Sequence, residues 1–290
     1  MTEIAPSTAA VAAPALHRRR FVPRIQGRVA TSAALLVTFV AVLAAVAAPL
    51  IAPYSPTELD LGGALAAPSW SHPMGTDSVG RDIFSRLVYG ARLSLLGPLV
   101  VVALSTAVGV PLGLAAGYLG GRVDAVLSRL WDVLLAFPSL LLAILVVAAF
   151  GPSFVTATVA LAVVYTPLVA RVVRGLVLAE STRTYVSAFR TLGYGDARIA
   201  FRHVLPNVSP AIVAQATLNF GYALLDLAGL SFIGLGVQAP TADWGTMLAQ
   251  GREDLLLSHT EVIFPAAAII LVAVSFNLLG DALGGRLERR

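Results

Sequence analysis

Residues 92–117 read RLSLLGPLVVVALSTAVGVPLGLAAG, a run with no charged residue after Arg92. About 20 mostly apolar residues are enough for a helix to cross a hydrocarbon core about 30 Å thick. Five other long runs are mostly apolar, and the whole chain is only 12% charged, with a mean hydropathy of +0.83. We therefore expect an all-α integral membrane protein with six transmembrane helices, near residues 29–52, 92–117, 126–150, 154–178, 209–236 and 262–281.

Residue types that the chain lacks exclude several kinds of chemistry. All 20 basic residues are Arg, so the chain has no Lys for a P-loop or a Schiff base. It has no Cys for a disulfide, a thiol nucleophile or a thiolate metal site. The four His (17, 72, 203 and 259) lie far apart, and we predict no metal site and no catalytic residue, although His72 and His259 could meet outside. The arginines form no stripe with aromatic residues, which argues against nucleic acid.

The arginines also predict orientation, because cytoplasmic loops are enriched in basic residues. With the N-terminus inside, Arg81, Arg86, Arg92 and Arg252 fall outside, and the other 16 of the 20 arginines are cytoplasmic. Both termini are then cytoplasmic, and the first apolar run is a retained helix, since it exceeds the roughly 7–15 residues of a signal-peptide core. We expect a cytoplasmic tail (1–28), a first transmembrane helix (29–52), an extracytoplasmic segment (53–91), a five-helix core (92–281) with a cytoplasmic loop (179–208), and a second tail (282–290).

Two of the predicted spans carry a pattern on one helix face. Gly109, Gly113 and Gly117 recur every four residues in the second span, a small-residue face that predicts close helix packing. In the fifth span, polar side chains at 4, 3 and 4 residue intervals fall on one face: Gln215, Asn219, Tyr222 and Asp226. Intramembrane polar residues usually face a bundle interior or a watery cavity. This stripe is interpreted either as pore-lining or as interhelical hydrogen bonding.

The extracytoplasmic segment ends in a pattern typical of an amphipathic helix. Asp77 or Ser78 can serve as its N-cap, and Val79, Ile83 and Leu87 recur at helical spacing. We expect this helix to lie at the outer membrane surface.

The cytoplasmic loop predicts two short helices joined by a turn. Gly193 suits a left-handed position after the first helix, Asp196 can cap the second, and Pro206 follows its end. With Tyr185 and Phe189 one turn apart and several arginines around them, the loop forms a knob suited to docking a soluble partner. A pair of helices lying on the membrane surface is the alternative.

Several stretches, in order over residues 72–281, carry a resemblance to a known family. They are Met74-Gly75-Thr76-Asp77 with Gly80-Arg81-Asp82, Ser85-Arg86, Gly90 to Ser94, Arg202 to Asn207, Leu230 to Gly236, Trp244-Gly245 and Asn277 to Asp281. The chain resembles the shorter permease subunit of bacterial ATP-binding cassette importers of the dipeptide, oligopeptide and nickel group. The resemblance implies a type I importer permease fold in the bacterial cytoplasmic (inner) membrane.

The family's ATPase-coupling motif can be laid on the cytoplasmic loop. Its positions fall on Ser187, Ala188, Phe189, Gly193, His203, Leu205 and Pro206, with Tyr185 just before them. Ser187 stands where the motif has Glu, and His203 where it has Ile. The glycine turn and the Leu-Pro end carry over, whereas the contact of the Glu does not. After Asp281 the chain also departs from the family's charged tail.

The resemblance further implies partners and a cargo. The expected partners are a second permease subunit in a heterodimer, two cytoplasmic ATP-binding subunits, an extracytoplasmic substrate-binding protein and the lipid bilayer. ATP and Mg are expected on the ATP-binding subunits, with no cofactor on this chain. Peptide is the default cargo, and nickel or another peptide-like cargo is the alternative. An ion-driven secondary transporter, a membrane scaffold and, last, a membrane enzyme are the competing classes.

Overall fold

Every regular element in residues 24–287, the part of the chain that this computed structural model describes, is a helix. Two short turns accompany the helices, a 3-10 turn at Leu61–Gly63 and a π-helical turn at Ala200–Val204 that joins α7 to α8. The expected tails lie largely outside the described residues. The first helix is described from Arg24, and its part that is apolar enough to cross a membrane is Val29–Ile51, in agreement with the predicted span. In chain order the helices are α1 (Arg24–Ile51), α2 (Ile83–Leu119), α3 (Gly121–Leu135), α4 (Ser139–Phe150), α5 (Phe154–Ser181), α6 (Thr184–Thr191), α7 (Asp196–Ile199), α8 (Leu205–Phe232), α9 (Trp244–Gly251) and α10 (Thr260–Leu287).

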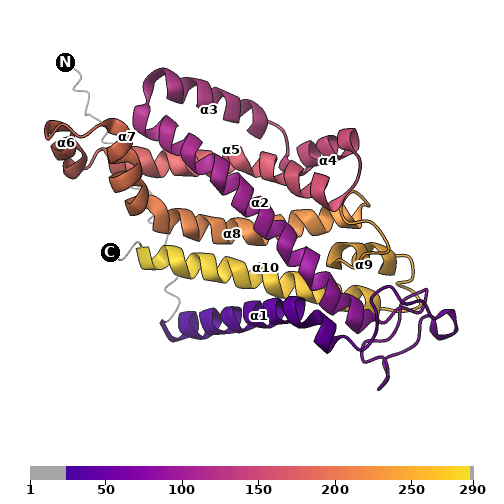
Figure 1. Cartoon of the computed structure of the whole chain (residues 1–290). Coiled ribbons are helices and arrows are strands. Elements are labelled where there is room, and N and C mark those ends of the chain that lie inside the picture. Colours follow the sequence, from indigo (N-terminus) through magenta and orange to yellow (C-terminus); the bar gives the residue numbers. More distant parts are fainter. Residues whose placement is uncertain (1–23, 288–290) are drawn as a thin grey trace, which may run out of the picture.

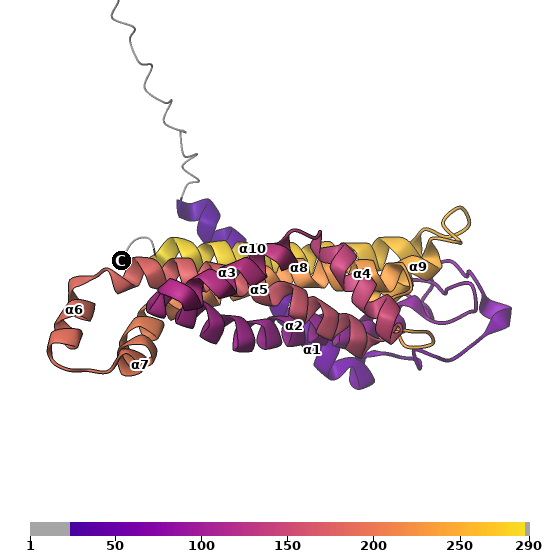
Figure 2. The ribbon, with the colours of Figure 1, turned by 90° about the horizontal axis from the view of Figure 1, so that it is seen from above.

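The long helices form an elongated bundle with two different ends. Helices α1, α2, α5, α8 and α10 are each long and apolar enough to cross a membrane. The most extensive packing joins α2 to α5, and α8 packs on α10 (Figure 1). Figure 2 shows α6 and α7 projecting at one end, with α9 and the chain between α1 and α2 at the other. The start of α1 and the end of α10 both lie toward the α6 and α7 end (Figure 1), as the expected topology requires.

The third predicted span is broken. Helices α3 and α4 are long and apolar enough to cross a membrane only when taken together, and they meet at an angle of 83°. Pro138 precedes the first residue of α4; its ring disfavours a helical conformation at Phe137, and it has no N–H to donate. The prediction of one helix over 126–150 is therefore wrong, although the pair still carries the chain from one end of the bundle to the other (Figure 1).

The predicted amphipathic helix is also different in the structure. Asp82 is the N-cap, accepting a hydrogen bond from the Ser85 N–H at 2.7 Å, and α2 runs unbroken from there to Leu119. The expected cap residue Asp77 lies instead in a folded loop before the helix. The helical pattern after Ile83 is thus the outer end of a long transmembrane helix rather than a separate surface helix.

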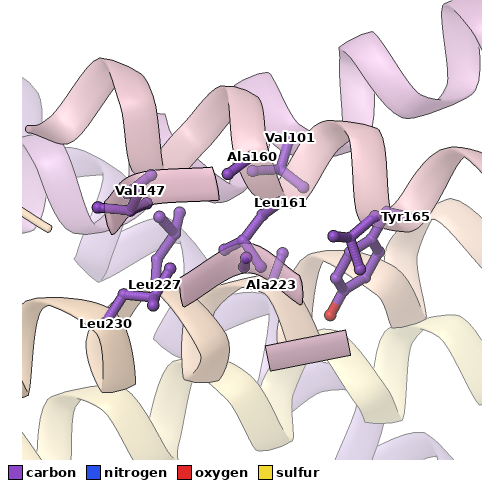
Figure 3. Close-up of a cluster of buried hydrophobic side chains, with 11 residues drawn as sticks. Val101, Val147, Ala160, Leu161, Tyr165, Ala223, Leu227 and Leu230 are labelled. Carbon is purple, nitrogen blue, oxygen red and sulfur yellow. The ribbon is translucent and has the colours of Figure 1, made fainter. Parts of the chain in front are cut away.

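Glycine allows α2 and α5 to pack closely. A Cβ on Gly113 would lie 2.5 Å from the carbonyl oxygen of Ala170, and Gly109 and Gly117 face α5 in the same way. The prediction of a packing face is confirmed. Toward the outer half of the bundle, Leu161 of α5 is buried with Val101 of α2 and residues of α8 (Figure 3).

Candidate functional site

A cavity of about 510 Å³ opens where the break between α3 and α4 meets α5 and α8. The Tyr165 hydroxyl donates a hydrogen bond to Asp226, with 2.9 Å between Oη and Oδ2. Tyr165 lies at the edge of the apolar cluster drawn in Figure 3, with its hydroxyl beyond the neighbouring aliphatic side chains. The walls thus combine one carboxylate and two phenols with mostly apolar groups: Leu135, Phe137, Pro138, Ser139, Val164, Tyr165, Leu168, Tyr222 and Asp226.

The polar stripe predicted on the fifth span divides into two parts. Tyr222, with 52% of its surface exposed, and Asp226 line the large cavity. Gln215 instead donates to Asn219, at 3.0 Å between Nε2 and Oδ1, and Asn219 is buried with its Nδ2 lacking a hydrogen-bond partner. Gln215 and Asn219 thus bond within α8, and the stripe's interhelical hydrogen bond is that of Asp226 with Tyr165 of α5. Pore lining stays a prediction.

The residues that sequence reasoning missed at the cavity come from other helices. Tyr165 is 61 positions before Asp226 in the sequence, and Ser139 is the first residue of α4, directly after the break in the third span. Tyr165 lies in an apolar run and carries no signal of its own. Pro138 was a usable signal for the break, because proline limits the helix before it.

The cytoplasmic loop is closed at its base by a hydrogen-bonded triad. The Tyr185 hydroxyl donates to Glu180 at 2.9 Å, and the Asn207 side-chain amide donates to both Glu180 and Tyr185 at 3.1 Å. Burial raises the pKa of the Tyr185 hydroxyl above its usual value, so it remains a neutral donor. Glu180 is a site residue that the sequence pattern did not identify, and Asn207 ends a stretch that carries the resemblance but had no predicted partner.

The tip of the loop presents a small aromatic cluster. Phe189 stacks on His203 with ring centroids 4.1 Å apart, and Tyr194 lies 5.2 Å from Phe189. Gly193 has φ +80°, as the predicted turn requires. The other motif residues Ser187, Ala188 and Pro206 are exposed, and Leu205 is half-buried. The loop therefore carries a half-buried aromatic cluster with Tyr194 at its surface, beside the exposed residues Ser187 and Ala188.

Two details of the predicted loop are wrong. Asp196 is the first residue of α7 rather than its cap, and its carboxylate accepts a hydrogen bond from the Tyr118 hydroxyl at 3.0 Å. Pro206 does not end a helix, because the chain stays helical from Asp196 through Phe232. A π-helical turn at Ala200–Val204, just before Leu205, lets the helix continue past Pro206. Such a turn widens the backbone hydrogen-bond pattern of the helix where proline has no N–H to donate.

The extracytoplasmic motif folds around a buried carboxylate. Asp77 Oδ1 accepts the backbone N–H groups of Val79 and Arg81 at 3.0 and 2.8 Å, and its Oδ2 lies 2.6 Å from Arg81 Nε and 3.6 Å from Arg86 Nε. Both guanidinium groups donate to Gln250 of α9, at 3.1 and 2.7 Å. The motif therefore fastens the loop before α2 to the segment after α8.

The remaining motif residues fix this loop locally. Gly75 and Gly80 have φ +80°, and a Cβ on Gly80 would lie 1.7 Å from the Asp60 carbonyl oxygen. Thr76 accepts a hydrogen bond from the Ala66 N–H at 2.8 Å, and Asp82 pairs with His72 at 3.0 Å. His72 is thus bonded to a carboxylate rather than to His259. Within the described residues, no three His, Asp or Glu side chains are grouped to hold a metal ion.

A second buried carboxylate joins α9 to α2. Asp243 caps α9 by accepting the N–H groups of Gly245 and Thr246, and it accepts the Ser94 hydroxyl at 2.6 Å. Burial raises the pKa of the Asp243 carboxyl, and the Ser94 hydrogen bond opposes that rise. Trp244, next to it, donates its indole N–H to the Leu87 carbonyl at 2.9 Å. The motif residues Trp244 and Gly245 therefore have a structural role at this end of the bundle.

Comparison with known proteins agrees with this architecture. Residues 109–290 match the family described as binding-protein-dependent transport system inner membrane component. The chain is 44% identical to a dipeptide transport system permease protein, DppC, of Alkalihalophilus pseudofirmus, over 85% of this chain and 81% of that protein. It is 42% identical to a probable D,D-dipeptide transport system permease protein, DdpC, of Escherichia coli K12 (89% and 86%), and 43% identical to a glutathione transport system permease protein, GsiD, of Pectobacterium atrosepticum (76% and 73%). The chain belongs to the family of inner membrane components of binding-protein-dependent transport systems.

Proposed function

We propose that this chain is a permease subunit of an ATP-driven importer and forms one half of a translocation pathway for dipeptides or other short peptides. The named relatives are transport permeases for dipeptides, D,D-dipeptides and glutathione, which are all small peptides or peptide-like molecules. The observation that carries the proposal is the cavity at the break between α3 and α4, where Asp226 meets an interrupted membrane span.

Two independent features argue that lipid does not cover this cavity. A charged side chain at the centre of a membrane helix costs about 2.5–3.5 kcal/mol on insertion scales. A helix break leaves backbone groups unsatisfied, which is tolerated only inside protein or beside water. Both features lie on the wall formed by α3, α4, α5 and α8. We infer that a second permease subunit covers this wall and that the cavity becomes the water-filled path between the two.

Energy must reach this path from another polypeptide. The chain has no Lys, so it cannot carry a P-loop lysine, and ATP and Mg are assigned to two cytoplasmic ATP-binding subunits. The loop from Tyr185 to Pro206 is the proposed docking element, because it carries an aromatic cluster with Tyr194 exposed and its base is tied to α5 and α8 by Glu180 and Asn207.

The connections of this loop suggest how a movement is transmitted. Glu180 is in the last turn of α5, and α7 continues through the π-helical turn into α8. A shift of the docked loop would therefore move α5 and α8 together, and these are the two helices that hold Tyr165 and Asp226. Closure of the ATP-binding subunits would exchange an inward-open path for an outward-open one, as a rigid-body switch.

The opposite end is assigned to an extracytoplasmic binding protein. The loop between α1 and α2 projects there with Trp70 fully exposed, while the Asp77 network holds its base rigid. Arg252 and the exposed Leu256 and Leu257 lie on a second loop beyond α9. A rigid base with exposed tips suits the docking of a soluble protein that delivers cargo.

The test is ATP-dependent uptake by proteoliposomes that contain this chain, its co-expressed permease, both ATP-binding subunits and the binding protein. Labelled dipeptides should accumulate only when ATP and the binding protein are both present. Uptake of a nickel complex but of no peptide would overturn the assigned cargo. Uptake driven by an ion gradient without ATP would overturn the importer class.

A second test addresses the docking element. Deletion of residues 185–204 should abolish co-isolation of the ATP-binding subunits while the two permeases still associate. Normal stoichiometry of the ATP-binding subunits in the deleted variant would show that the loop is not the docking element.

A further inference from the structure

We propose that Asp226 is a cation-selective station in the pathway and binds the ammonium group of the passing cargo. The inference rests on the proposed function, because it assumes that the cavity lies on the path. It goes further in naming the chemical group that is recognised there and in predicting the charge that the membrane subunits prefer.

The carboxylate of Asp226 is only partly satisfied by the protein. Its Oδ2 accepts the Tyr165 hydroxyl, and its Oδ1 accepts no hydrogen bond from the described residues. Asp226 is half-buried and lines the cavity. One acceptor oxygen is thus held in place by Tyr165, and the other is available to a group that enters.

The cavity has no basic residue of its own to balance this charge. None of its lining residues is Arg or His, and Asp226 makes no ion pair within residues 24–287. A carboxylate with low-dielectric walls attracts cations and repels anions more strongly than one in water. The cavity is therefore matched to a positive group and mismatched to a second carboxylate.

The aromatic walls fit the same ligand. Phe137, Tyr165 and Tyr222 line the same cavity as the carboxylate, and aromatic faces stabilise ammonium ions, most strongly when water is excluded. An ammonium group has donors and no acceptor, so it can use Oδ1 without displacing the Tyr165 hydroxyl. Every unmodified peptide carries such a group at its amino terminus. A single carboxylate holds it weakly enough to release it, which a conducting path requires.

The competing explanation is that Asp226 only fastens α8 to α5 through Tyr165. The two explanations differ in what Tyr165→Phe does. This variant removes the hydrogen bond between the helices but leaves the carboxylate in the cavity, whereas Asp226→Asn removes the charge and keeps a side chain of the same shape.

The experiment measures maximal uptake of two cargoes that differ in the amino-terminal ammonium group, alanyl-alanine and N-acetyl-alanyl-alanine, by the complete transporter in proteoliposomes. Binding protein loaded to saturation is used, so that its own affinity does not enter the ratio. The unaltered transporter should move alanyl-alanine, which carries the ammonium group, about tenfold faster, the usual effect of one charge-assisted contact. Asp226→Asn should bring the ratio close to one, and Asp226→Glu and Tyr165→Phe should preserve it. Asp281→Asn, an exposed carboxylate at the cytoplasmic end of α10, is the charge-matched control and should change nothing.

Each contrary outcome identifies what has failed. Equal maximal rates for the two peptides in the unaltered transporter would overturn the inference without any variant. An unchanged ratio in Asp226→Asn would overturn it too, and a ratio lost equally in Tyr165→Phe would assign Asp226 to helix packing. Failure of the unaltered transporter to move any peptide would instead overturn the proposed function, on which the inference rests.

Discussion

Asp77 illustrates how a single buried carboxylate organises the outer face. It is buried, and it accepts hydrogen bonds from Val79 and Arg81 and pairs with the guanidinium groups of Arg81 and Arg86. Because removing one member of a buried ion pair leaves the partner charges uncompensated, such sites are sensitive to substitution even when the intact pair adds little net stability.

Asp77→Ala should therefore destabilise the extracytoplasmic segment by about 3–5 kcal/mol. The measurement is the thermal unfolding midpoint of the permease in lipid nanodiscs, together with protease cleavage of the loop before α2. Glu253→Gln is the control, since its pair with Arg252 is long, at 4.0 Å, and exposed; it should cost less than about 0.5 kcal/mol. Equal midpoints and equal cleavage for the two variants would contradict the assigned role of Asp77.

For single residues, the sequence predicted where polar side chains lie but not which residues they contact. The spacing of Tyr222 and Asp226 on one helix face was sufficient to place both at a cavity. Tyr165 could not be found, because the contact depends on how α5 packs against α8 and nothing in the surrounding apolar run marks it. Asp77 was likewise expected to cap a surface helix. An aspartate before a helical pattern can be either an N-cap or the centre of a buried ion pair, and the sequence does not distinguish the two roles.

Among the elements, the contact between α2 and α5 depends on residues without side chains. The closest neighbours of Gly113 are the Ala170 carbonyl oxygen at 2.5 Å and Val173 at 2.7 Å from the position of a Cβ. The backbone of α5 cannot move aside as the end of a flexible side chain can. A methyl group added at Gly113 must therefore push α2 and α5 apart.

Gly113→Ala should lower stability by about 1–3 kcal/mol, the usual cost of overpacking. Gly175→Ala on α5 is the matched control, because no atom lies within 4 Å of its Cβ position. That change should be neutral or stabilising by up to about 1 kcal/mol through helix propensity. The comparison uses unfolding midpoints of both variants in the same nanodiscs. A Gly113 variant as stable as the Gly175 variant would show that the helices do not pack as described.

The glycine turn of the cytoplasmic loop offers another matched pair. Gly193 has φ +80°, whereas Gly195, two residues later, has φ −66°, and neither has an atom within 4 Å of a Cβ. Gly193→Ala should strain the loop by about 1–2 kcal/mol and weaken binding of the ATP-binding subunits about 5- to 30-fold. Gly195→Ala should leave the affinity unchanged. The affinity is measured by titrating the subunits onto nanodisc-embedded permease, and equal affinities in the two variants would remove the turn from the docking element.

The long helices were largely predictable from apolar length, but the third span was not. Counting apolar residues over 126–150 cannot distinguish a straight helix from two helices bent at Pro138, because both keep the same composition. The bend is set by the local restriction around proline and by the neighbours that accept it. The bend also lies at the cavity of the proposed pathway. The position where the chain departs from the predicted straight helix is therefore a position to which a function is assigned.

For the whole molecule, the two ends and the cavity form one connected arrangement. The cytoplasmic loop is joined to α5 and α8, these helices hold the Tyr165–Asp226 contact, and the Asp77 network fastens the outer loops around α9. Arginine counts predict which end faces the cytoplasm without tertiary information, because that bias reflects membrane insertion, and this orientation stays a prediction. The surface that meets the second permease could not be read in this way, since it depends on the fold of both subunits.

Accessibility of the cavity to water-soluble thiol reagents tests the central claim most directly. The chain has no Cys, so Tyr222→Cys and Ser139→Cys introduce unique thiols. In the complete transporter in membranes, both thiols should react with a membrane-impermeant thiosulfonate reagent, and ATP-driven cycling should change the side from which they react. Leu36→Cys, on the exposed apolar surface of α1, should stay unreactive. Failure of both cavity thiols to react from either side, with or without ATP, would contradict a translocation pathway through this cavity.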